Sequence, residues 1–432
     1  MRSRHALISS LTRMLIPHPS FLIPDFVVFP ECFIFASYKS SYTMKHACLL
    51  PFLFLFGVLS AQTPASQLSP DARISLMTVA PGEYVYSTFG HSAIRVYDPQ
   101  QRLDRCYNYG TFDFEQPNFL LKFCRGKLLY FLDLEPYRSF EYGNLSDRRA
   151  MKEQWLQLDT VQKQRLFSLL QENAREENRY YKYDFFYDNC ATRIRDIVKE
   201  SLFHQIAFDS TKLPLGLTMR DLLHQYLTTL PWTEFGIDLV LGTPADRRAA
   251  PEAFMFLPDY VHDMFAAAKL PNGAPLVGRE IFTPQQPFPA PEWKPGFFER
   301  PLFVTCFVAL LGLLSMANPR TEHIFDTIFW FVLGLAGLIM ALLWFATDHS
   351  ATKSNYNLMW AMPTHLLVFW RLRATDKLRH YFIVMAILAA LALVFWKFWP
   401  QAMPTAAIPL AGLVVVKGLW RQWWEKEVRG EK

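Results

Sequence analysis

The chain has 432 residues, enough for about three modules of ordinary size. Charged residues make up 19% and apolar residues 51%, which excludes disordered, low-complexity and small disulfide-scaffold classes. The net charge of +5 is too small to indicate a nucleic-acid partner. The apolar residues gather in long blocks after Pro301, whereas the chain before that point has the composition of a soluble domain. We therefore expect a soluble module fused to a membrane module.

The N-terminal region contains a segment typical of a secretory signal peptide. Met44, Lys45 and His46 form a short basic stretch, residues 47–58 are apolar, and small residues follow up to Ala61. Twelve apolar residues are too few to span a bilayer, so we assign 44–61 to a signal peptide. Residues 1–43 are then a mis-annotated start that precedes the real initiator. The alternative is an ordered N-terminal segment.

The C-terminal part, 301–424, has the pattern of a transmembrane domain of about five helices. The apolar blocks are 301–317, 327–346, 358–370, 381–399 and 404–419. The third is short and contains Pro363 and His365, which favours a short, tilted or re-entrant segment. Lys and Arg concentrate in loop 371–380 and after Leu419, whereas loop 347–357 contains only Lys353. The positive-inside rule then places the C-terminus in the cytoplasm and the soluble module outside it, in a multi-pass membrane protein.

Residues 62–285 are expected to form one periplasmic catalytic domain of the α+β class, followed by a Pro-rich linker at 286–300. Alternating patterns predict strands, and capping residues predict helices that begin after Asp159, after Asn189 and at a capping box between Thr218 and Asp221. The predicted strands are 74–79, 91–97, 104–110 and 127–133, and the helices are 160–173, 190–202 and 222–227.

Cys190 is the first candidate for chemistry. Three cysteines lie in the domain, Cys106, Cys124 and Cys190, and an odd number leaves one thiol unpaired in an oxidising compartment. A pairing of Cys106 with Cys124 would leave Cys190 free. Cys190 lies in the first turn of a predicted helix, where the helix dipole and free N–H groups lower a thiol pKa and can hold an oxyanion. The alternative is a buried, inert cysteine.

A nucleophilic cysteine needs a base. His91 follows Gly90 at the head of an alternating strand, whereas His204, His224 and His262 lie on amphipathic helical stretches and are assigned to the surface or to interfaces. A histidine at a strand start and a cysteine at a helix start is the arrangement of papain-like enzymes, here in the circularly permuted order. The next strand should supply a residue that orients the imidazole, and Asn108 is the first choice with Asp113 as the reserve.

Other chemistries have less support in the sequence. The histidines of the domain lack paired metal-ligand spacing, and no phosphate-binding glycine loop is present, so no metal or cofactor is expected.

Several segments resemble one known family. They include YSTFGHSAIRVYDP, YNYGTFDF, NRYYKYDFFYDNCATRIRDIV and TDHSATKSNYNLMWAMPTHL, and the likeness runs from about Arg73 to about Arg373. This pattern is similar to the Lnb-type lipoprotein N-acyltransferases of Gram-negative envelopes, which join a periplasmic domain to a transmembrane domain. The resemblance implies a permuted papain-like core, like that of lecithin:retinol acyltransferase-like proteins, with His91 and Cys190 as the thiol dyad.

The resemblance implies transfer of a fatty acyl chain from a phospholipid, through a thioester on Cys190, to the N-terminal amine of a membrane lipoprotein. Donor and acceptor both lie in the bilayer, which explains the membrane module. The alternatives are a cysteine peptidase or amidase that acts on peptidoglycan and a non-enzymatic membrane scaffold.

Two groups of residues are candidates for substrate binding. His349 and Asn355, in loop 347–357, are expected beneath the soluble domain, facing lipid phosphate or the acceptor amine, unless the loop is a solvated turn. Phe186 and Tyr187 belong to an aromatic run before Cys190 and are candidates for an acyl groove, with a core strand as the alternative.

Overall fold

A computed structural model gives the fold, with the backbone described for residues 67–284, 296–369 and 376–428. Residues 63–432 form one compact unit. The predicted signal peptide at 44–61, the extension at 1–43 and residues 286–295 of the predicted linker lie outside the described residues. The end of that linker contains a short 3-10 turn, Phe297–Glu299, before the first membrane helix.

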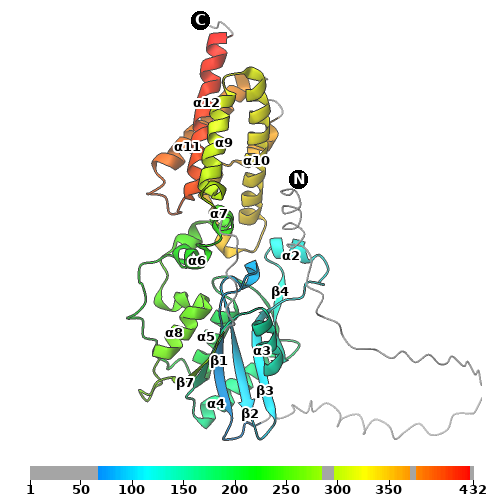
Figure 1. The fold of residues 1–432 in the computed structure, drawn as a ribbon, viewed down its shortest axis with the longest axis vertical. Coiled ribbons are helices and arrows are strands. Elements are labelled where there is room, and N and C mark those ends of the chain that lie inside the picture. Colours follow the sequence, from blue (N-terminus) through cyan, green and yellow to red (C-terminus); the bar gives the residue numbers. More distant parts are fainter. Residues whose placement is uncertain (1–66, 285–295, 370–375, 429–432) are drawn as a thin grey trace, which may run out of the picture. The chain divides into compact units, whose positions relative to one another are not determined.

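The described part of the soluble domain is built on one antiparallel sheet with the strand order β6-β4-β3-β2-β1-β5-β7 (Figure 1). Strands β1 to β4 follow one another as a meander, and β5 returns to pair with the free side of β1. The strands are β1 (Arg73–Val79), β2 (His91–Asp98), β3 (Leu103–Thr111), β4 (Leu129–Pro136), β5 (Met151–Leu156), β6 (Tyr180–Lys182) and β7 (Val277–Thr283). The α+β class is therefore confirmed.

Both faces of the sheet are covered. Alternate residues such as Leu76 and Tyr107 enter a large core with α4 (Thr160–Asn173), α5 (Cys190–Ser201) and α8 (Pro258–Ala267). Their neighbours along the strands, such as Met77 and Cys106, enter a smaller core with α3 (Tyr137–Ser146). The period-two alternation of a strand thus separates two apolar layers.

The predicted helix starts are confirmed. Asp159, Asn189 and Thr218 each close a capping box at the start of α4, α5 and α6 (Met219–Leu227). The sequence analysis missed the strands β5, β6 and β7 and the helices α2 (Phe119–Cys124), α3, α7 (Pro231–Val240) and α8. His262 was assigned to the surface or to an interface, but it is buried and contacts Asp263 and Glu280 at 2.8 and 3.1 Å.

The membrane part contains α9 (Pro301–Ser315), α10 (Pro319–Phe345), α11 (Asp376–Val394) and α12 (Ile408–Val428) among the described residues. The third apolar block does not form an α-helix: it contains the 3-10 turns Tyr356–Met359 and Pro363–Leu367. Its backbone packs directly on α10, where a side chain at Gly337 would overlap the carbonyl of Ala361. An irregular segment is tolerated at membrane depth when protein covers it in this way.

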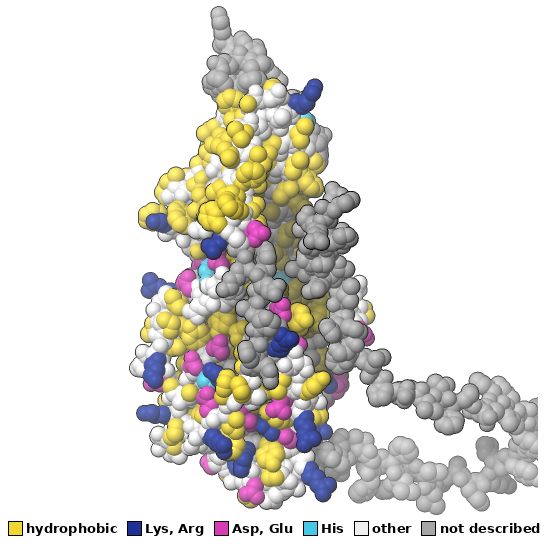
Figure 2. Space-filling view, in the orientation of Figure 1, with side chains coloured by type: hydrophobic (Ala, Val, Ile, Leu, Met, Phe, Trp, Pro, Cys, Tyr) yellow, Lys and Arg dark blue, Asp and Glu magenta, His cyan; other side chains and the backbone are white. Residues whose placement is uncertain are grey.

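Only α10 is both long and apolar enough to cross a membrane by itself among the described helices, while α9 and the apolar parts of α11 and α12 are shorter. Figure 2 shows apolar side chains covering the membrane helices, whereas charged side chains concentrate over the sheet domain. This division agrees with a membrane module joined to a soluble module.

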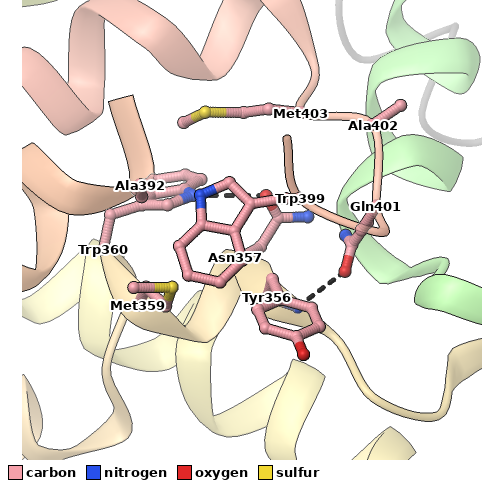
Figure 3. A pocket seen from close by; sticks show the side chains of 9 residues that line it. All are labelled: Tyr356, Asn357, Met359, Trp360, Ala392, Trp399, Gln401, Ala402 and Met403. Atoms are coloured by element: carbon pink, nitrogen blue, oxygen red, sulfur yellow. Dashed lines mark hydrogen bonds between the residues drawn. The ribbon is translucent and has the colours of Figure 1, made fainter. Parts of the chain in front are cut away.

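Amide side chains join the two modules. Asn355 Nδ2 donates to the carbonyls of Leu239 and Val240 at 2.7 and 3.2 Å, and Gln401 Nε2 donates to the carbonyl of Leu241 at 3.1 Å. These carbonyls lie at the end of α7, where the last backbone acceptors of a helix need partners. Gln401 also accepts a hydrogen bond from the backbone N–H of Tyr356, as the close-up of a small cavity in Figure 3 shows. The end of α7 is therefore seated on the membrane module.

A buried ion pair connects two membrane helices. Lys417 of α12 lies 2.9 Å from Asp326 of α10, and both side chains are fully enclosed. Lys417 also donates to Ser315 Oγ at the end of α9. Charges inside a membrane module are costly unless they are paired, so this contact fixes how three helices meet.

We expect Lys417→Met to lower the stability of the detergent-solubilised protein by about 3–5 kcal/mol, because it leaves a buried carboxylate without its partner. The double variant Lys417→Met with Asp326→Leu should recover much of that loss, and thermal unfolding measures both. Lys397→Met, which removes an exposed lysine of the same module, is the control. A double variant no more stable than the single one would contradict the role of the pair.

Candidate active site

Cys190 is the first residue of α5, and the residue before it holds the helix start together. Asn189 Oδ1 accepts from the backbone N–H groups of Ala191 and Thr192, both at 2.9 Å. Asn189 Nδ2 donates to the carbonyls of Phe185 and Phe256 at 2.8 Å. The Asp-Asn-Cys motif therefore works as an N-cap that is itself anchored at both sides.

His91 is the first residue of β2, and a glycine is needed before it. Gly90 has φ +78°, and a Cβ there would lie 2.9 Å from the carbonyl of Val79. No other residue turns the chain here without strain, because L side chains rarely adopt positive φ. The Gly-His motif is thus a turn that delivers the imidazole to the end of the sheet.

Asn108 of β3, which the sequence analysis chose as the residue that orients the imidazole, contacts the ring, and its catalytic role stays a prediction. His91 Nε2 lies 2.5 Å from Asn108 Oδ1, and Asn108 Nδ2 donates to Glu135 Oε1 of β4 at 2.9 Å. The bond to Glu135 fixes the amide orientation, so Asn108 presents its oxygen to the ring. Because an amide oxygen only accepts, Nε2 carries the proton and Nδ1 keeps its lone pair. The imidazole is therefore held in the tautomer that a general base requires.

The start of α5 packs against β2 and β3, which brings Cys190 to the same end of the sheet as His91. Gly110 of β3 has φ +92°, a conformation that favours glycine, and a Cβ there would lie in ordinary van der Waals contact with Cys190 Cβ at 3.5 Å. The backbone N–H groups of Ser92, Ala191 and Cys190 itself lie close enough to the thiol to favour its charged form and so to lower its pKa. Ser92 follows His91 directly, so these donors and the imidazole share one site.

Burial keeps both groups neutral. Burial, followed by the positive charge of Arg149, lowers the pKa of His91 to about 4. Burial raises the pKa of Cys190 above its ordinary value, and this effect exceeds the opposing effects of the three N–H groups and of Arg149. The sequence analysis expected a lowered thiol pKa from the helix start alone, and that expectation is wrong because desolvation is the larger effect. The resting pair is a thiol and a neutral imidazole.

The remaining cysteines and the reserve carboxylate lie apart from this pair. Cys106 and Cys124 are both free in the structure, the first buried and the second exposed, so the pairing considered from sequence is absent. Asp113 is exposed and accepts from the N–H of Glu115 in the turn after β3.

The predicted substrate-binding residues divide into two pairs. Phe186 is buried in a core cluster against Phe256, and Tyr187 beside it is exposed. His349 Nε2 donates to the carbonyl of Phe123 in α2 at 3.0 Å, and the amide of Asn355 is taken up by the end of α7. Contact of these four residues with substrate stays a prediction, and the bonds of Asn355 give it a structural role.

Sequence reasoning missed several residues of the site. Glu135 comes from a strand that carries no motif, and Gly110 is recognisable only as a glycine inside a strand pattern. Tyr181 was noted only as part of the aromatic run, yet its hydroxyl is buried near the thiol and has no hydrogen-bond partner. Arg149 had no sequence signal, because a single Arg after a helix is usually a surface residue.

A cluster of possible ligands, His224, Glu234 and Asp238, lies at the joint between α6 and α7, with one donor atom of each within 4.8 Å of the others. Asp238 Oδ1 already accepts from Arg220 at 2.7 Å and from His224 at 2.9 Å. Because the carboxylate of Asp238 already accepts these two hydrogen bonds, the cluster is a hydrogen-bonded contact between α6 and α7.

Comparison with protein families gives two matches. Residues 62–225 match the Lnb N-terminal periplasmic domain, and residues 293–427 match the Lnb transmembrane domain. Comparison with curated proteins and with solved structures finds no match. The matched ranges include His91, Asn108 and Cys190, and they describe a membrane protein with a periplasmic N-terminal domain.

The neutral resting pair predicts how Cys190 reacts with iodoacetamide. Because its pKa is raised, thiolate forms only as the pH rises beyond the ordinary thiol range, and alkylation should increase steeply through alkaline pH. Because the pKa of His91 is lowered to about 4, the imidazole remains a neutral base as the pH falls towards that value. Alkylation rates across a pH series, with site identification by mass spectrometry, measure the first effect. A reactivity plateau at neutral pH would instead reveal a thiolate–imidazolium pair.

Proposed function

This chain belongs to the Lnb family, and we propose that it is a cysteine-dependent lipoprotein N-acyltransferase. The observation that supports this proposal best is the arrangement around the thiol: a helix-start cysteine, three backbone donors and an oriented imidazole at one end of the sheet. His91 precedes Cys190 along the chain, which is the order found in circularly permuted papain-like enzymes.

The first half-reaction forms a thioester. His91 Nδ1 takes the proton of Cys190 as Sγ attacks an ester carbonyl of a phospholipid donor. The carbonyl oxygen becomes an oxyanion, which the N–H groups of Ser92, Ala191 and Cys190 are placed to stabilise. The ester C–O bond breaks, the leaving oxygen takes the proton from the imidazolium, and a lysophospholipid departs from the acyl-enzyme.

The second half-reaction reverses these roles. The N-terminal amine of a membrane lipoprotein attacks the thioester, and His91 takes a proton from the attacking nitrogen. The C–S bond breaks, the thiolate of Cys190 recovers a proton from His91, and an amide is released. The step needs no oxidant or reductant, because acyl transfer changes no oxidation state.

Contacts with the membrane module support lipid substrates. Helix α2 exposes Leu120, Leu121 and Phe123, and the N–H of Asp348, just beyond α10, donates to the carbonyl of Arg125 at its end. An exposed apolar helix beside the end of a membrane helix is typical of an interfacial element. We propose that the sheet domain lies in the periplasm of an inner-membrane protein, with loop 347–357 on the same side and the C-terminus in the cytoplasm. The contact of this loop with the end of α2 supports its placement beside the sheet domain.

The competing functions predict different chemistry. A peptidoglycan amidase would also need Cys190 but would not carry a fatty acyl group, and a scaffold would need neither. Acyl analysis of lipoprotein N-termini distinguishes the acyltransferase from the amidase. Loss of function on mutation of Cys190 distinguishes an enzyme from a scaffold.

We expect wild-type protein given phospholipid to accumulate a hydroxylamine-labile acyl group on Cys190, and Cys190→Ser to lose both this group and lipoprotein N-acylation. Serine has nearly the same volume, but its hydroxyl is a much weaker nucleophile without a base tuned for it. Mass spectrometry of the active-site peptide and of lipoprotein N-termini measures the two effects. His91→Gln should be equally inactive, because an amide cannot accept the proton near neutral pH.

Cys124→Ser is the matched control, since Cys124 is an exposed thiol of the same domain. Normal N-acylation in a Cys190→Ser strain at wild-type protein level would refute the mechanism. Failure of acylation in the Cys124→Ser strain alone would move the nucleophile to that residue.

Asn108→Ala should lower kcat by roughly 10- to 100-fold with little change in KM, because a base free to rotate loses part of the gain from general base catalysis. Asn108→Asp keeps an oxygen acceptor but adds a negative charge beside the ring. It should raise the pKa of His91 and move the acid limb of the pH–rate profile upward. Glu135→Gln, which keeps an acceptor for Asn108 Nδ2, should change kcat far less. An unchanged acid limb in Asn108→Asp would mean that Asn108 does not hold the base.

A further inference from the structure

Arg149 is a buried cation with only neutral hydrogen-bond partners. It lies between α3 and β5, and 7% of it is exposed. Its Nε donates to the carbonyl of Ala80 at 2.8 Å and its Nη1 to Asn144 Oδ1 at 3.2 Å. Its Nη2 is buried and has no hydrogen-bond partner. The exposed carboxylate of Asp147 attracts it only through space.

The guanidinium lies at the end of the sheet that contains Cys190 and His91. Ala80 directly follows Val79, and Val79 pairs with His91 on one side and with Met151 on the other. The positive charge of Arg149 acts on both Cys190 and His91. Arg149 thus belongs to the active-site end of the sheet, although neither half of the proposed mechanism uses it.

The loop between β1 and β2 encloses the stem of Arg149 and presents an apolar outer edge. A Cβ at Gly82 would lie 3.0 Å from Arg149 Cδ, so the loop is closely packed on the side chain. Beyond it Tyr84, Val85 and Tyr86 are exposed, and the two tyrosine rings stack at 5.4 Å. A fixed cation behind an exposed apolar edge matches a ligand that has an anionic group next to hydrocarbon.

We propose that Arg149 binds the phosphate of the glycerophospholipid donor while an ester of the same molecule faces Cys190. Burying a cation without a counter-charge is unfavourable, and so is leaving one of its N–H donors without an acceptor. An anionic ligand would supply both the negative charge and the acceptor. The guanidinium fork also matches the geometry of phosphate oxygens. The proposal rests on the acyltransferase function and adds a selection rule: phosphate-bearing donors are preferred over neutral diacylglycerols.

The test compares two short-chain donors, dihexanoyl phosphatidylglycerol and dihexanoylglycerol, in the full-length protein, with acylation of Cys190 as the readout. Arg149→Met keeps the apolar stem but removes the charge. It should lower kcat/KM for the phospholipid by about 10- to 100-fold, as expected for loss of a charge-assisted hydrogen bond, and change that for the neutral donor less than about threefold. Arg149→Lys should lie between wild type and Arg149→Met.

Two controls isolate the charge. Arg148→Met removes an exposed positive charge from the neighbouring position and should behave as wild type. Asn144→Ala removes one structural hydrogen bond of Arg149 but leaves its charge, so preference for the phospholipid should persist. Equal loss with both donors in Arg149→Met would overturn the proposal and assign Arg149 to the fold or to the oxyanion. Unchanged preference would overturn it as well.

A binding readout separates this proposal from the acyltransferase function. If neither donor acylates Cys190 in the wild-type protein, the acyltransferase function is contradicted. Protection of Cys190 from iodoacetamide by a bound ligand then tests the phosphate subsite alone. Dihexanoyl phosphatidylglycerol should slow alkylation in wild type but not in Arg149→Met. Glycerol 3-phosphate is the second probe, and protection by it alone would assign the site to a free phosphate. Equal protection of wild type and Arg149→Met would overturn the proposal.

Discussion

The candidate active site depends on one packing contact. In this contact, the first turn of α5 packs against the start of β2 and the end of β3. Gly110 lies at this contact, within van der Waals distance of Cys190, and its φ of +92° is a conformation that L side chains rarely adopt. The same contact brings the thiol close to backbone N–H groups and places it at the same end of the sheet as His91. A shift of α5 would therefore remove the oxyanion donors and the base together, which explains why its N-cap, Asn189, is anchored to two other segments.

Desolvation decides the protonation of this site. The helix dipole and the N–H groups favour a thiolate, but burial favours the neutral thiol and is the larger effect. The imidazole is neutral for the same reason. In the proposed mechanism, the neutral thiol becomes a strong nucleophile only when His91 takes its proton during attack. Arg149, whose charge acts on both groups, is positive and is suited to an anionic ligand.

The membrane module holds the soluble domain in place through hydrogen bonds. Asn355 and Gln401 satisfy carbonyls at the end of α7, and the backbone after α10 binds the end of α2. Two separate parts of the soluble domain are thus hydrogen-bonded to the membrane module. Inside that module, Lys417 and Asp326 join α12 to α10 in a setting where an unpaired charge would be costly. Together these contacts fix the position of the thiol domain on the membrane module, next to the bilayer that would supply the proposed substrates.

The sequence by itself determined the features that depend on local pattern. Alternation revealed β1 to β4, capping residues located α4, α5 and α6, and residue order selected His91, Asn108 and Cys190. Long-range packing was not accessible to it. The strands β5, β6 and β7 pair with segments that lie far away along the chain. Pro363 and His365 indicated an irregular third block, but not its 3-10 turns or its packing on α10. The hydrogen bonds of Asn355 to carbonyls of α7 left no pattern in the sequence. Only the tertiary structure showed that burial raises the pKa of Cys190 and that Arg149 lies beside it, since desolvation and through-space charge depend on which distant segments meet.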